Sequence, residues 1–246
     1  MCLIVLLHRV HPDAPVIFAA NRDEFRERPS ESMQLLEAGP PRIAGGRDLS
    51  AGGTWMAIGE HGVIAGLTNQ RGPEGPDSSR RSRGELPLVL ARAESADEAA
   101  ERAREIDAPL YNPCTLFVAD AESAHYVELW DSSKTERLEP GVHILENRLR
   151  GTPSPKAEAV AVNLDGVLTL SGDALRERLE HVLSDPTIPE AKSTDRPAPL
   201  NAARVDLGSY GTRSATLVFA SVGSAPRIWH VDTPPGDSPF TERTPF

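Results

Sequence analysis

Short apolar runs separated by turn-forming residues dominate the chain. Residues 2–10 and 15–20 are rich in Val and Ile and are separated by the proline-containing stretch HPDAP, which is typical of two core strands in a hairpin. The same pattern predicts further hairpins over 54–69, 114–131 and 214–232, and a short strand over 142–147. We therefore expect largely antiparallel sheets.

Helical periodicity is confined to two regions. In the first region, the stretch 83–93 is predicted to be helical and leads into Ser95, which with Glu98 predicts a capping box for a second helix over 96–106. In the second region, a helix is predicted over 173–183, where Leu175, Leu179, Val182 and Leu183 share one face, and Asp185-Pro186 ends it. The stretch 185–201, rich in Pro, Ser and Asp, predicts a surface loop, and the tail 233–246 an extended, partly mobile segment.

The order of these elements predicts the fold class. Strand pairs, helices, strands, one helix and further strands follow one another without an internal repeat or a long linker. We expect one α+β domain over 1–246, with helices packed on the outer faces of two largely antiparallel sheets.

Composition and charge exclude several classes of function. The net charge of −10 argues against a nucleic-acid-binding surface, which needs clustered Lys and Arg. Two cysteines and scattered histidines predict neither a disulfide framework nor a metal site. The first apolar run is too short for a signal peptide or a membrane span, and we therefore expect a cytoplasmic protein without a transmembrane segment.

Cys2, directly after the initiator methionine, is a candidate nucleophile. Methionine aminopeptidases act best before small residues, so removal of Met1 would leave one residue with a thiol and a free α-amine. Such an amine titrates near ~8 and a thiol near ~8.5, which suits a base and its nucleophile. The alternative is a small apolar residue at the start of a buried strand.

A polar run, NRDE, closes the second apolar strand. Strand alternation predicts that Asn21 and Asp23 point to one face and Arg22 and Glu24 to the other. In a hairpin this end returns close to Cys2, where a carboxylate can hold the α-amine or orient a proton carrier. The alternative is structural: a buried ion pair of Arg22 and Glu24 that fixes the strand end.

Three further polar residues end or interrupt apolar strands. They are Asn69 in GLTNQR, Asn147 in HILENRLRGTP and Arg213 in YGTRSAT. Amide groups can form an oxyanion hole, and an arginine near a thiol favours the thiolate. Each residue alone fits a turn equally well, since Asn is a common turn former.

An ordered series of motifs resembles the NRDE family, which includes the Transport and Golgi organisation 2 proteins. The motifs are MCLIV, AANRDEF, GGTWMAI, GLTN, SRGEL, YNPCTLFVAD, PGVHILEN, TPSPK and YGTRSATLV. Two departures are Glu146, where a small residue is expected, and the absence of a tryptophan from GTPSPK. The resemblance implies an N-terminal-nucleophile (Ntn) hydrolase-like fold, a four-layer α-β-β-α sandwich.

A remoter similarity, to choloylglycine hydrolases and penicillin V acylases, implies roles for single residues. Cys2 attacks a carbonyl, Asp23 orients the α-amine, Asn69 and Asn147 stabilise the oxyanion, and Arg213 lowers the pKa of the thiol. Asn21, Arg22, Glu24 and Trp55 are then substrate-binding or structural residues.

Two functions follow as expectations. The first is an Ntn-type hydrolase or acyltransferase acting on a small-molecule amide or acyl substrate, on non-peptide C–N bonds and without a cofactor. The second, drawn from animal relatives, is a non-catalytic carrier that binds or traffics haem or an acyl lipid. An anionic amphiphile suits both functions, since Arg22 and Arg213 are basic. The oligomeric state and the substrate stay open.

Overall fold

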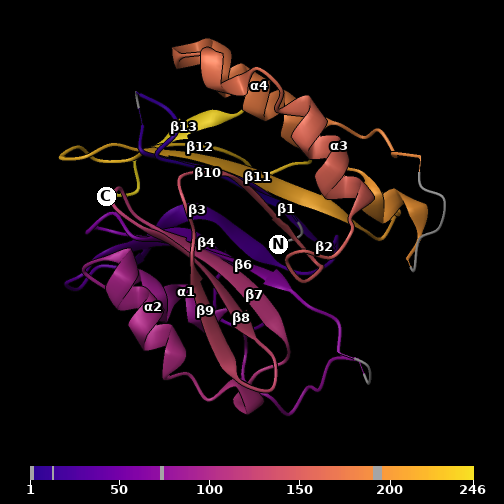
Figure 1. Ribbon diagram of the computed structural model, residues 1–246. Coiled ribbons are helices and arrows are strands. Elements are labelled where there is room, and N and C mark those ends of the chain that lie inside the picture. The colour runs from indigo at the N-terminus through magenta and orange to yellow at the C-terminus, as the bar shows by residue number, and fades with distance from the viewer. Residues whose placement is uncertain (1–2, 13, 73–74, 191–195) are drawn as a thin grey trace.

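The computed structural model describes residues 3–12, 14–72, 75–190 and 196–246. Within these ranges, two antiparallel sheets face each other and helices cover their outer sides, as Figure 1 shows. The first sheet has the order β10 (Gly141–Glu146), β1 (Leu3–His8), β2 (Val16–Phe25), β11 (Tyr210–Ala220), β12 (Arg227–Val231) and β13 (Thr241–Arg243). The second runs from β3 to β9 in chain order: β3 (Ser30–Glu37), β4 (Ile43–Asp48), β5 (Met56–Gly59), β6 (Ile64–Asn69), β7 (Cys114–Ala119), β8 (Ala124–Leu129) and β9 (Ser133–Arg137).

Helices form the two outer layers. Helices α3 (Pro155–Asn163) and α4 (Gly172–Ser184) lie on the first sheet, and α1 (Glu85–Ala91) and α2 (Ala96–Arg104) lie on the second. Single 3₁₀ turns are formed at Ala108–Leu110, Val167–Thr169 and Ala198–Asn201. The predicted four-layer α-β-β-α sandwich is thereby confirmed.

Strand alternation distributes the apolar side chains over three cores. On β1, Ile4 and Leu6 enter the core between the sheets, whereas Leu3, Val5 and Leu7 pack against α3 and α4. A third core lies between the second sheet and helices α1 and α2. Because β1 is buried on both faces, its sequence is a continuous apolar run.

Most predicted elements are confirmed, and the differences have local causes. The hairpins β1–β2, β5–β6, β7–β8 and β11–β12, strand β10 and the helix over 173–183 are all present. Strands β3, β4 and β9 and helix α3 were not predicted. Strands β3 and β9 are edge strands with several half-buried or exposed positions, so their alternation is weak. The tail is extended as expected, but Thr241–Arg243 pairs with β12 as strand β13.

The predicted cap of α2 is present in part. The Ser95 side chain accepts a hydrogen bond from the backbone N–H of Glu98 at 3.1 Å. The Glu98 carboxylate accepts from the backbone N–H of Glu94 at 2.8 Å and not from that of Ser95. The helix start is therefore fixed by the two residues of the motif, in a variant of the reciprocal box.

Strand β2 is longer than its apolar run, and this brings polar side chains into the sheet. The strand continues to Phe25, and its residues through Asp23 are buried. Its end pairs with β11, where a bulge interrupts the register between Thr212 and Ser214. The polar run therefore lies inside the sheet, next to the start of β1.

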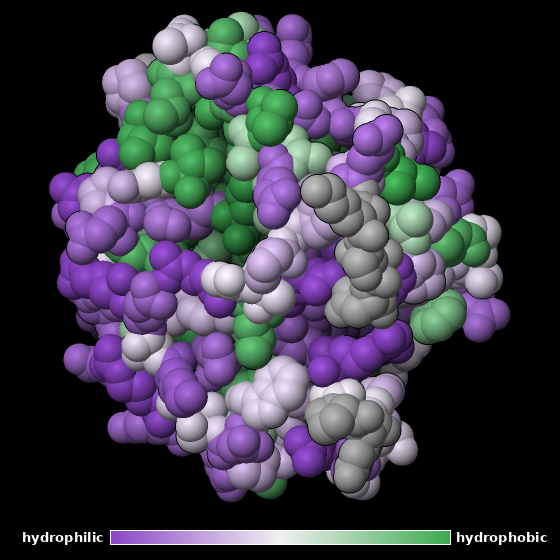
Figure 2. Space-filling model, turned by 45° about the vertical axis from the view of Figure 1, so that its right-hand side comes forward, coloured by the Kyte–Doolittle hydropathy of each residue, from purple (hydrophilic) through white to green (hydrophobic). Residues whose placement is uncertain are grey.

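Membrane-spanning helices and metal-binding clusters are both absent from the described residues. None of their helices is long and apolar enough to cross a membrane. Among the same residues, no group of three or more His, Cys, Asp or Glu side chains is arranged to hold a metal ion. Figure 2 shows a mostly hydrophilic face, in which apolar side chains form a strip that runs from the upper part into a central hollow.

Candidate active site at the start of strand β1

The start of β1 lies between two strands that carry candidate residues. Leu3 is the register partner of Asn21 on β2 and of Glu146 on β10. Cys2, the candidate nucleophile, lies outside the described residues, as does Met1. The described groups around Leu3 therefore define the site.

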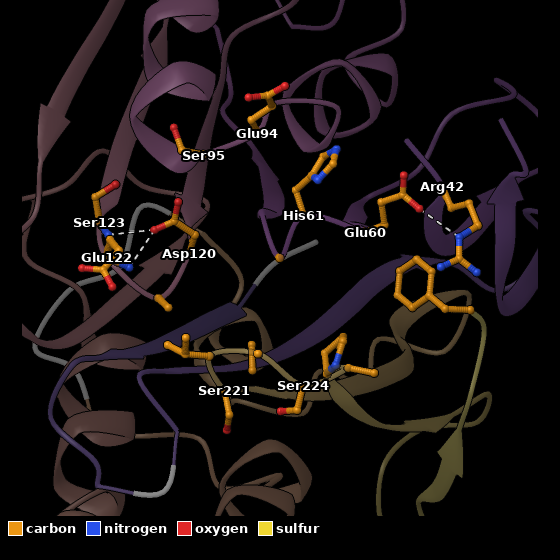
Figure 3. A pocket seen from close by; sticks show the side chains of 18 of the residues that line it. Arg42, Glu60, His61, Glu94, Ser95, Asp120, Glu122, Ser123, Ser221 and Ser224 are labelled. Atoms are coloured by element: carbon orange, nitrogen blue, oxygen red, sulfur yellow. Dashed lines mark hydrogen bonds and ion pairs between the residues drawn. The ribbon is translucent and has the colours of Figure 1, made fainter. Parts of the chain in front are cut away.

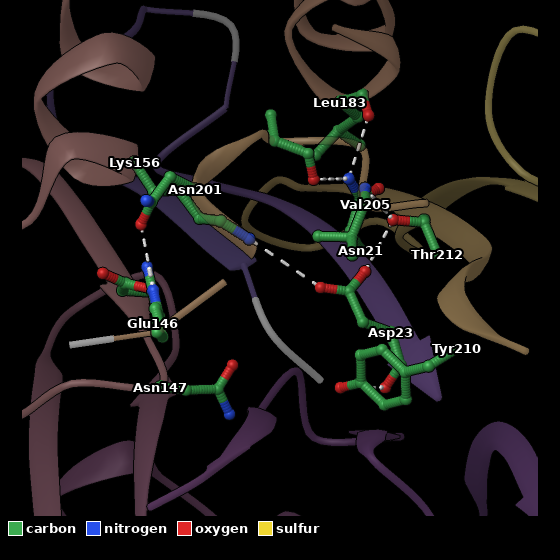
Figure 4. A network of polar contacts seen from close by, with 12 residues as sticks. Asn21, Asp23, Glu146, Asn147, Lys156, Leu183, Asn201, Val205, Tyr210 and Thr212 are labelled. Carbon is green, nitrogen blue, oxygen red and sulfur yellow. Dashed lines mark hydrogen bonds and ion pairs between the residues drawn. The ribbon is translucent and has the colours of Figure 1, made fainter. Parts of the chain in front are cut away.

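The Asp23 carboxylate is buried beside this strand end and has described partners on both oxygens. Thr212 on β11 donates its hydroxyl hydrogen to Asp23 Oδ1 at 2.6 Å. The Thr212 oxygen in turn accepts from the backbone N–H of Val205 at 2.9 Å, so the hydroxyl hydrogen is directed at Asp23. Figure 4 shows this chain of contacts. A carboxylate fixed in this way keeps one orientation.

Lys156 reaches the other oxygen of Asp23 from helix α3. Its Nζ lies 3.8 Å from Asp23 Oδ2, and the two side chains are 2% and 1% exposed. A lysine so deeply buried needs a counter-charge, because removing an ammonium from water is costly. In Figure 4 the Lys156 side chain extends from α3 across the interior to Asp23.

Asn21 joins the helical layer to the first sheet through two hydrogen bonds. Its amide nitrogen donates to the carbonyl oxygens of Leu183 and Ala203, each at 2.9 Å, and its side chain is fully buried. As the alternation predicts, Asn21 and Asp23 point to this face of the sheet. The contacts of Asn21 join β2 to the end of α4 and to the segment before β11.

The two asparagines expected to form an oxyanion hole lie side by side. The Asn147 side-chain nitrogen donates to the backbone oxygen of Asn69 at 2.6 Å. Next to them, Thr68 and Gln70 donate to the backbone oxygen of Glu146, at 3.1 and 3.2 Å. The ends of β6 and β10, which belong to different sheets, are therefore joined at this site.

Glu146 anchors the start of helix α3. Its side chain is 4% exposed. One carboxylate oxygen accepts from the hydroxyl of Ser154, the N-cap of α3, and the other accepts from Arg196 at 2.7 Å. The unexpected glutamate of the sequence thus holds the helix that carries Lys156.

Arg22 points to the opposite face of β2, between the sheets. Its guanidinium carbon lies 4.3 Å from the centre of a Trp55 ring, a cation–π distance. Arg22 is 3% exposed, and among the described residues no acceptor lies within hydrogen-bond distance of its terminal nitrogens. Burial lowers the pKa of Arg22, while the nearby charges of Glu24 and Asp48 oppose this effect.

The proposed ion pair of Arg22 and Glu24 is not formed. Instead, Glu24 lies 3.8 Å from Arg28 and accepts a hydrogen bond from the backbone N–H of Phe25 at 2.9 Å. The two side chains share a face of the strand and the charge of Glu24 acts on Arg22, but no direct ion pair joins them and the Arg22 guanidinium lies over Trp55. The purely structural explanation of the NRDE motif as such a pair is therefore wrong.

Arg213 lies in the bulge of β11 and is held by main-chain carbonyls. Its guanidinium donates to the oxygens of Phe25, at 3.0 Å, and Arg28, at 2.8 Å. Its charge is close enough to Arg22 to contribute to lowering the pKa of Arg22. Arg213 thus belongs to the cationic group on the inner face of β2.

The described cysteine is not a reactive thiol, and three of the described histidines lie on strands of the first sheet. Burial raises the pKa of Cys114 to about 12, so its thiol stays protonated at neutral pH. His230 has a hydrogen-bond partner on each ring nitrogen, Thr216 and Asp232, and His143 bonds to the carbonyl of Glu139. His8 and His230, each 1% exposed, are therefore closed to a ligand, whereas His143 is half-buried.

A cavity lies at the other end of the strands. It has a volume of about 640 Å³ and is lined by the turns between β5 and β6, β7 and β8, and β11 and β12. Figure 3 shows that two of its carboxylates have structural partners, since Glu60 pairs with Arg42 and Asp120 accepts from main-chain N–H groups. It is remote from Asn21 and Asn69.

Sequence reasoning missed Lys156, Thr212 and Glu146 as parts of the site. A signal for Lys156 is present, since Ser154-Pro155 is a helix-start pattern and Lys156 is one of only three lysines in the chain. Thr212 lies within the motif YGTRSATLV, but no spacing rule indicates that its hydroxyl meets Asp23.

Comparisons with known proteins agree on a family and a fold. The family model described as Transport and Golgi organisation 2 matches residues 1–225. The chain is 30% identical over 247 residues to a human protein named Transport and Golgi organization protein 2 homolog, covering 89% of this chain and 88% of the relative. The Bos taurus protein of that name is 29% identical, covering 95% and 98%.

Two solved structures share the fold. A Caenorhabditis elegans ortholog of N-acylethanolamine-hydrolyzing acid amidase superposes with a TM-score of 0.59 at 10% identity, covering 89% of this chain and 92% of that chain. A mutant conjugated bile acid hydrolase from Clostridium perfringens gives 0.55 at 10% identity, covering 94% and 89%. The fold is therefore that of the Ntn hydrolases.

Proposed function

The chain belongs to the Transport and Golgi organisation 2 family, and from this premise we propose that it is a cysteine Ntn hydrolase or acyltransferase. After removal of Met1 it acts on an amide or acyl bond of a small molecule. The observation that carries the proposal is Asp23, a buried carboxylate held on both oxygens beside the start of β1. Such a group suits an α-amine at that position.

The reaction begins with the two groups of Cys2. The thiol proton passes to the α-amine, directly or through water, and the sulfur attacks the substrate carbonyl carbon. The carbonyl π electrons move to the oxygen, and the Asn69 and Asn147 groups stabilise this oxyanion. In a well-studied protease one such donor contributes about 2.7–4 kcal/mol.

The intermediate then collapses with loss of the amine. The C–N bond breaks, the leaving nitrogen takes the proton from the α-ammonium, and a thioester joins the acyl group to Cys2. Water attacks this thioester, the restored amine accepts its proton, and the acid leaves as the thiol is regenerated. In the acyltransferase version, an acceptor nucleophile replaces the water.

The substrate class follows from charge and hydropathy. Arg22 and Arg213 are positive, and the face in Figure 2 has an apolar strip that enters a hollow. The two similar solved structures are named for hydrolysis of an N-acylethanolamine and of conjugated bile acids, both small-molecule amides. We expect an acyl substrate with an anionic group.

Hydrolysis of mono-4-nitroanilides of dicarboxylic acids of graded chain length, each with one free carboxylate, tests the proposal. Native-terminus protein should release nitroaniline, and Cys2→Ala should abolish the release while binding of the anilide persists. Equal release by both proteins would contradict the proposal. Saturable binding of haem or acyl-CoA without any release would instead support the non-catalytic carrier on the same scaffold.

A further inference from the structure

Lys156 is a buried charge that no assigned role explains. It belongs to α3, near the N-terminus of that helix, yet its side chain is 2% exposed and ends 3.8 Å from Asp23. A lysine on a helix of this kind can reach solvent by extending outward. Here it extends inward, at the cost of desolvation, to a carboxylate of the proposed site.

The surroundings of Lys156 form a bridge over the start of β1. Strand β10 contributes Glu146, which accepts from the α3 cap residue Ser154. Lys156 of helix α3 forms an ion pair with Asp23 on β2. Because Leu3 pairs with Asn21 on one side and with Glu146 on the other, this bridge joins the two strands that flank the N-terminal end of β1.

We propose that Lys156 is a positioning residue that holds the Asp23 carboxylate in place and adds a positive charge on the Asp23 face of the sheet, at the N-terminal end of β1. This inference rests on the proposed function, since it concerns the same thiol and amine. A nearby cation stabilises a thiolate and disfavours an ammonium, so it lowers the pKa of both groups. The α-amine is then neutral, and able to act as a base, at a lower pH.

The other charged or titratable groups near Asp23 do not contact its carboxylate in the way that Lys156 does. Tyr210 on β11 contacts the main-chain oxygen of Asp23, at 3.5 Å. Arg22 and Glu24 point to the opposite face of β2. On the side of β10, Glu146 is paired with Arg196 at 2.7 Å, and Arg148 lies 3.6 Å from it. Lys156 therefore supplies an added positive charge on the Asp23 face of β2.

The test is the pH dependence of Cys2 alkylation by iodoacetamide, followed by intact-protein mass. Replacing Lys156 by Met removes the charge at nearly constant volume and should raise the pH midpoint of alkylation by about one unit. Lys156→Arg keeps the charge and should leave the midpoint unchanged. The matched control is Lys134→Met, at an exposed position of β9, which should also leave it unchanged.

A purely structural role predicts a different result. Lys156→Met would then lower the melting temperature but leave the pH midpoint of Cys2 alkylation unchanged in the folded protein. That result would overturn the inference. If Lys156→Met does not fold, Lys156→Gln keeps a polar end for Asp23 and should show the same rise. A wild-type protein whose Cys2 is unreactive would overturn the proposed function, and this inference with it.

Discussion

Asp23 and Glu24 are neighbours with the same chemistry and opposite surroundings. Asp23 is buried and joined to Thr212 and Lys156, whereas the Glu24 side chain is 21% exposed and lies beside Arg28. Alternation along β2 separates them, because successive residues of a strand face opposite sides. The polar NRDE run therefore contains one buried carboxylate beside the start of β1 and one partly exposed carboxylate at the end of β2.

Exchanging each carboxylate for its amide separates the two roles. Asp23→Asn should abolish anilide turnover, and it should cost about 3 kcal/mol of folding free energy because Lys156 loses its buried counter-charge. Glu24→Gln should keep turnover and cost less than about 1 kcal/mol, since its ion pair is partly exposed. Turnover is measured on folded protein, and urea unfolding gives the stability.

This pair of variants also has a clear opposite outcome. Turnover that survives Asp23→Asn, or that is lost with Glu24→Gln, would show that the roles are assigned to the wrong carboxylates.

At the scale of elements, the edges of the two sheets are linked by a side chain. Asp232, directly after β12, accepts from His230 at 3.0 Å, from Ser32 on β3 at 2.8 Å and from Arg243 on β13 at 3.3 Å. The hydrogen bond from His230 is the main cause that lowers the pKa of Asp232. One carboxylate thus joins strands of both sheets.

The contacts of Asp232 predict that the difference in unfolding free energy between the wild-type protein and Asp232→Asn depends on pH. Because the native pKa of Asp232 is lower than the unfolded value, its contribution is present above the unfolded value and is lost as the pH falls through the native one. Asp232→Asn should cost about 0.5–1 kcal/mol at pH 7, since the side chain is half exposed. The difference should begin to shrink at about pH 4, the unfolded value, and disappear only at a lower pH, where the native carboxyl is also protonated.

Urea unfolding of the wild-type protein and of Asp232→Asn, from pH 7 to pH 3, measures this stability difference. If the unfolding free energies of the two proteins differ by the same amount at every pH, the charge of Asp232 contributes nothing to joining the two sheets.

The elements themselves were predictable where their pattern is strong. The run Leu3–Leu7 and the face of Leu175 and Leu179 predict β1 and α4 directly. Strand β9 was missed because its side chains are half buried or exposed and show little alternation. Helix α3 was missed although Ser154-Pro155 marks its start, because only a few of its residues are buried.

The site was predictable only where strand alternation and hairpin pairing determine the positions of its residues. Alternation and the first hairpin predicted that Asp23 lies near the start of β1, and the register confirms this placement. Lys156 could not be predicted, since its approach to Asp23 depends on how α3 docks on the sheet. Glu146 was noted only as a departure, yet it holds that helix.

For the whole molecule, the close approach of the two sheets depends on small residues between them. A Cβ atom on Gly66 of β6 would lie 2.4 Å from the Phe18 ring and 3.1 Å from Ile4, on the facing sheet. Phe18 is fully buried, so its ring has little room to move. A glycine here lets a large aromatic side chain fill the core.

Gly66→Ala should therefore lower the free energy of unfolding by about 1–3 kcal/mol through overpacking. Phe18→Leu in the same protein should recover part of this loss. Gly39→Ala is the control, because its Cβ would meet nothing within 4 Å, and it should stay within about 0.5 kcal/mol of the parent. A Gly66→Ala protein as stable as this control would contradict the packing argument.

The most direct test of the whole account is the intact mass of the native-terminus protein before and after a cysteine-reactive acyl or alkyl probe. The account predicts loss of Met1 and one fast adduct on Cys2, with Cys114 unmodified because it is buried and its pKa is raised to about 12. Retention of Met1, or a folded protein whose Cys2 does not react, would contradict it.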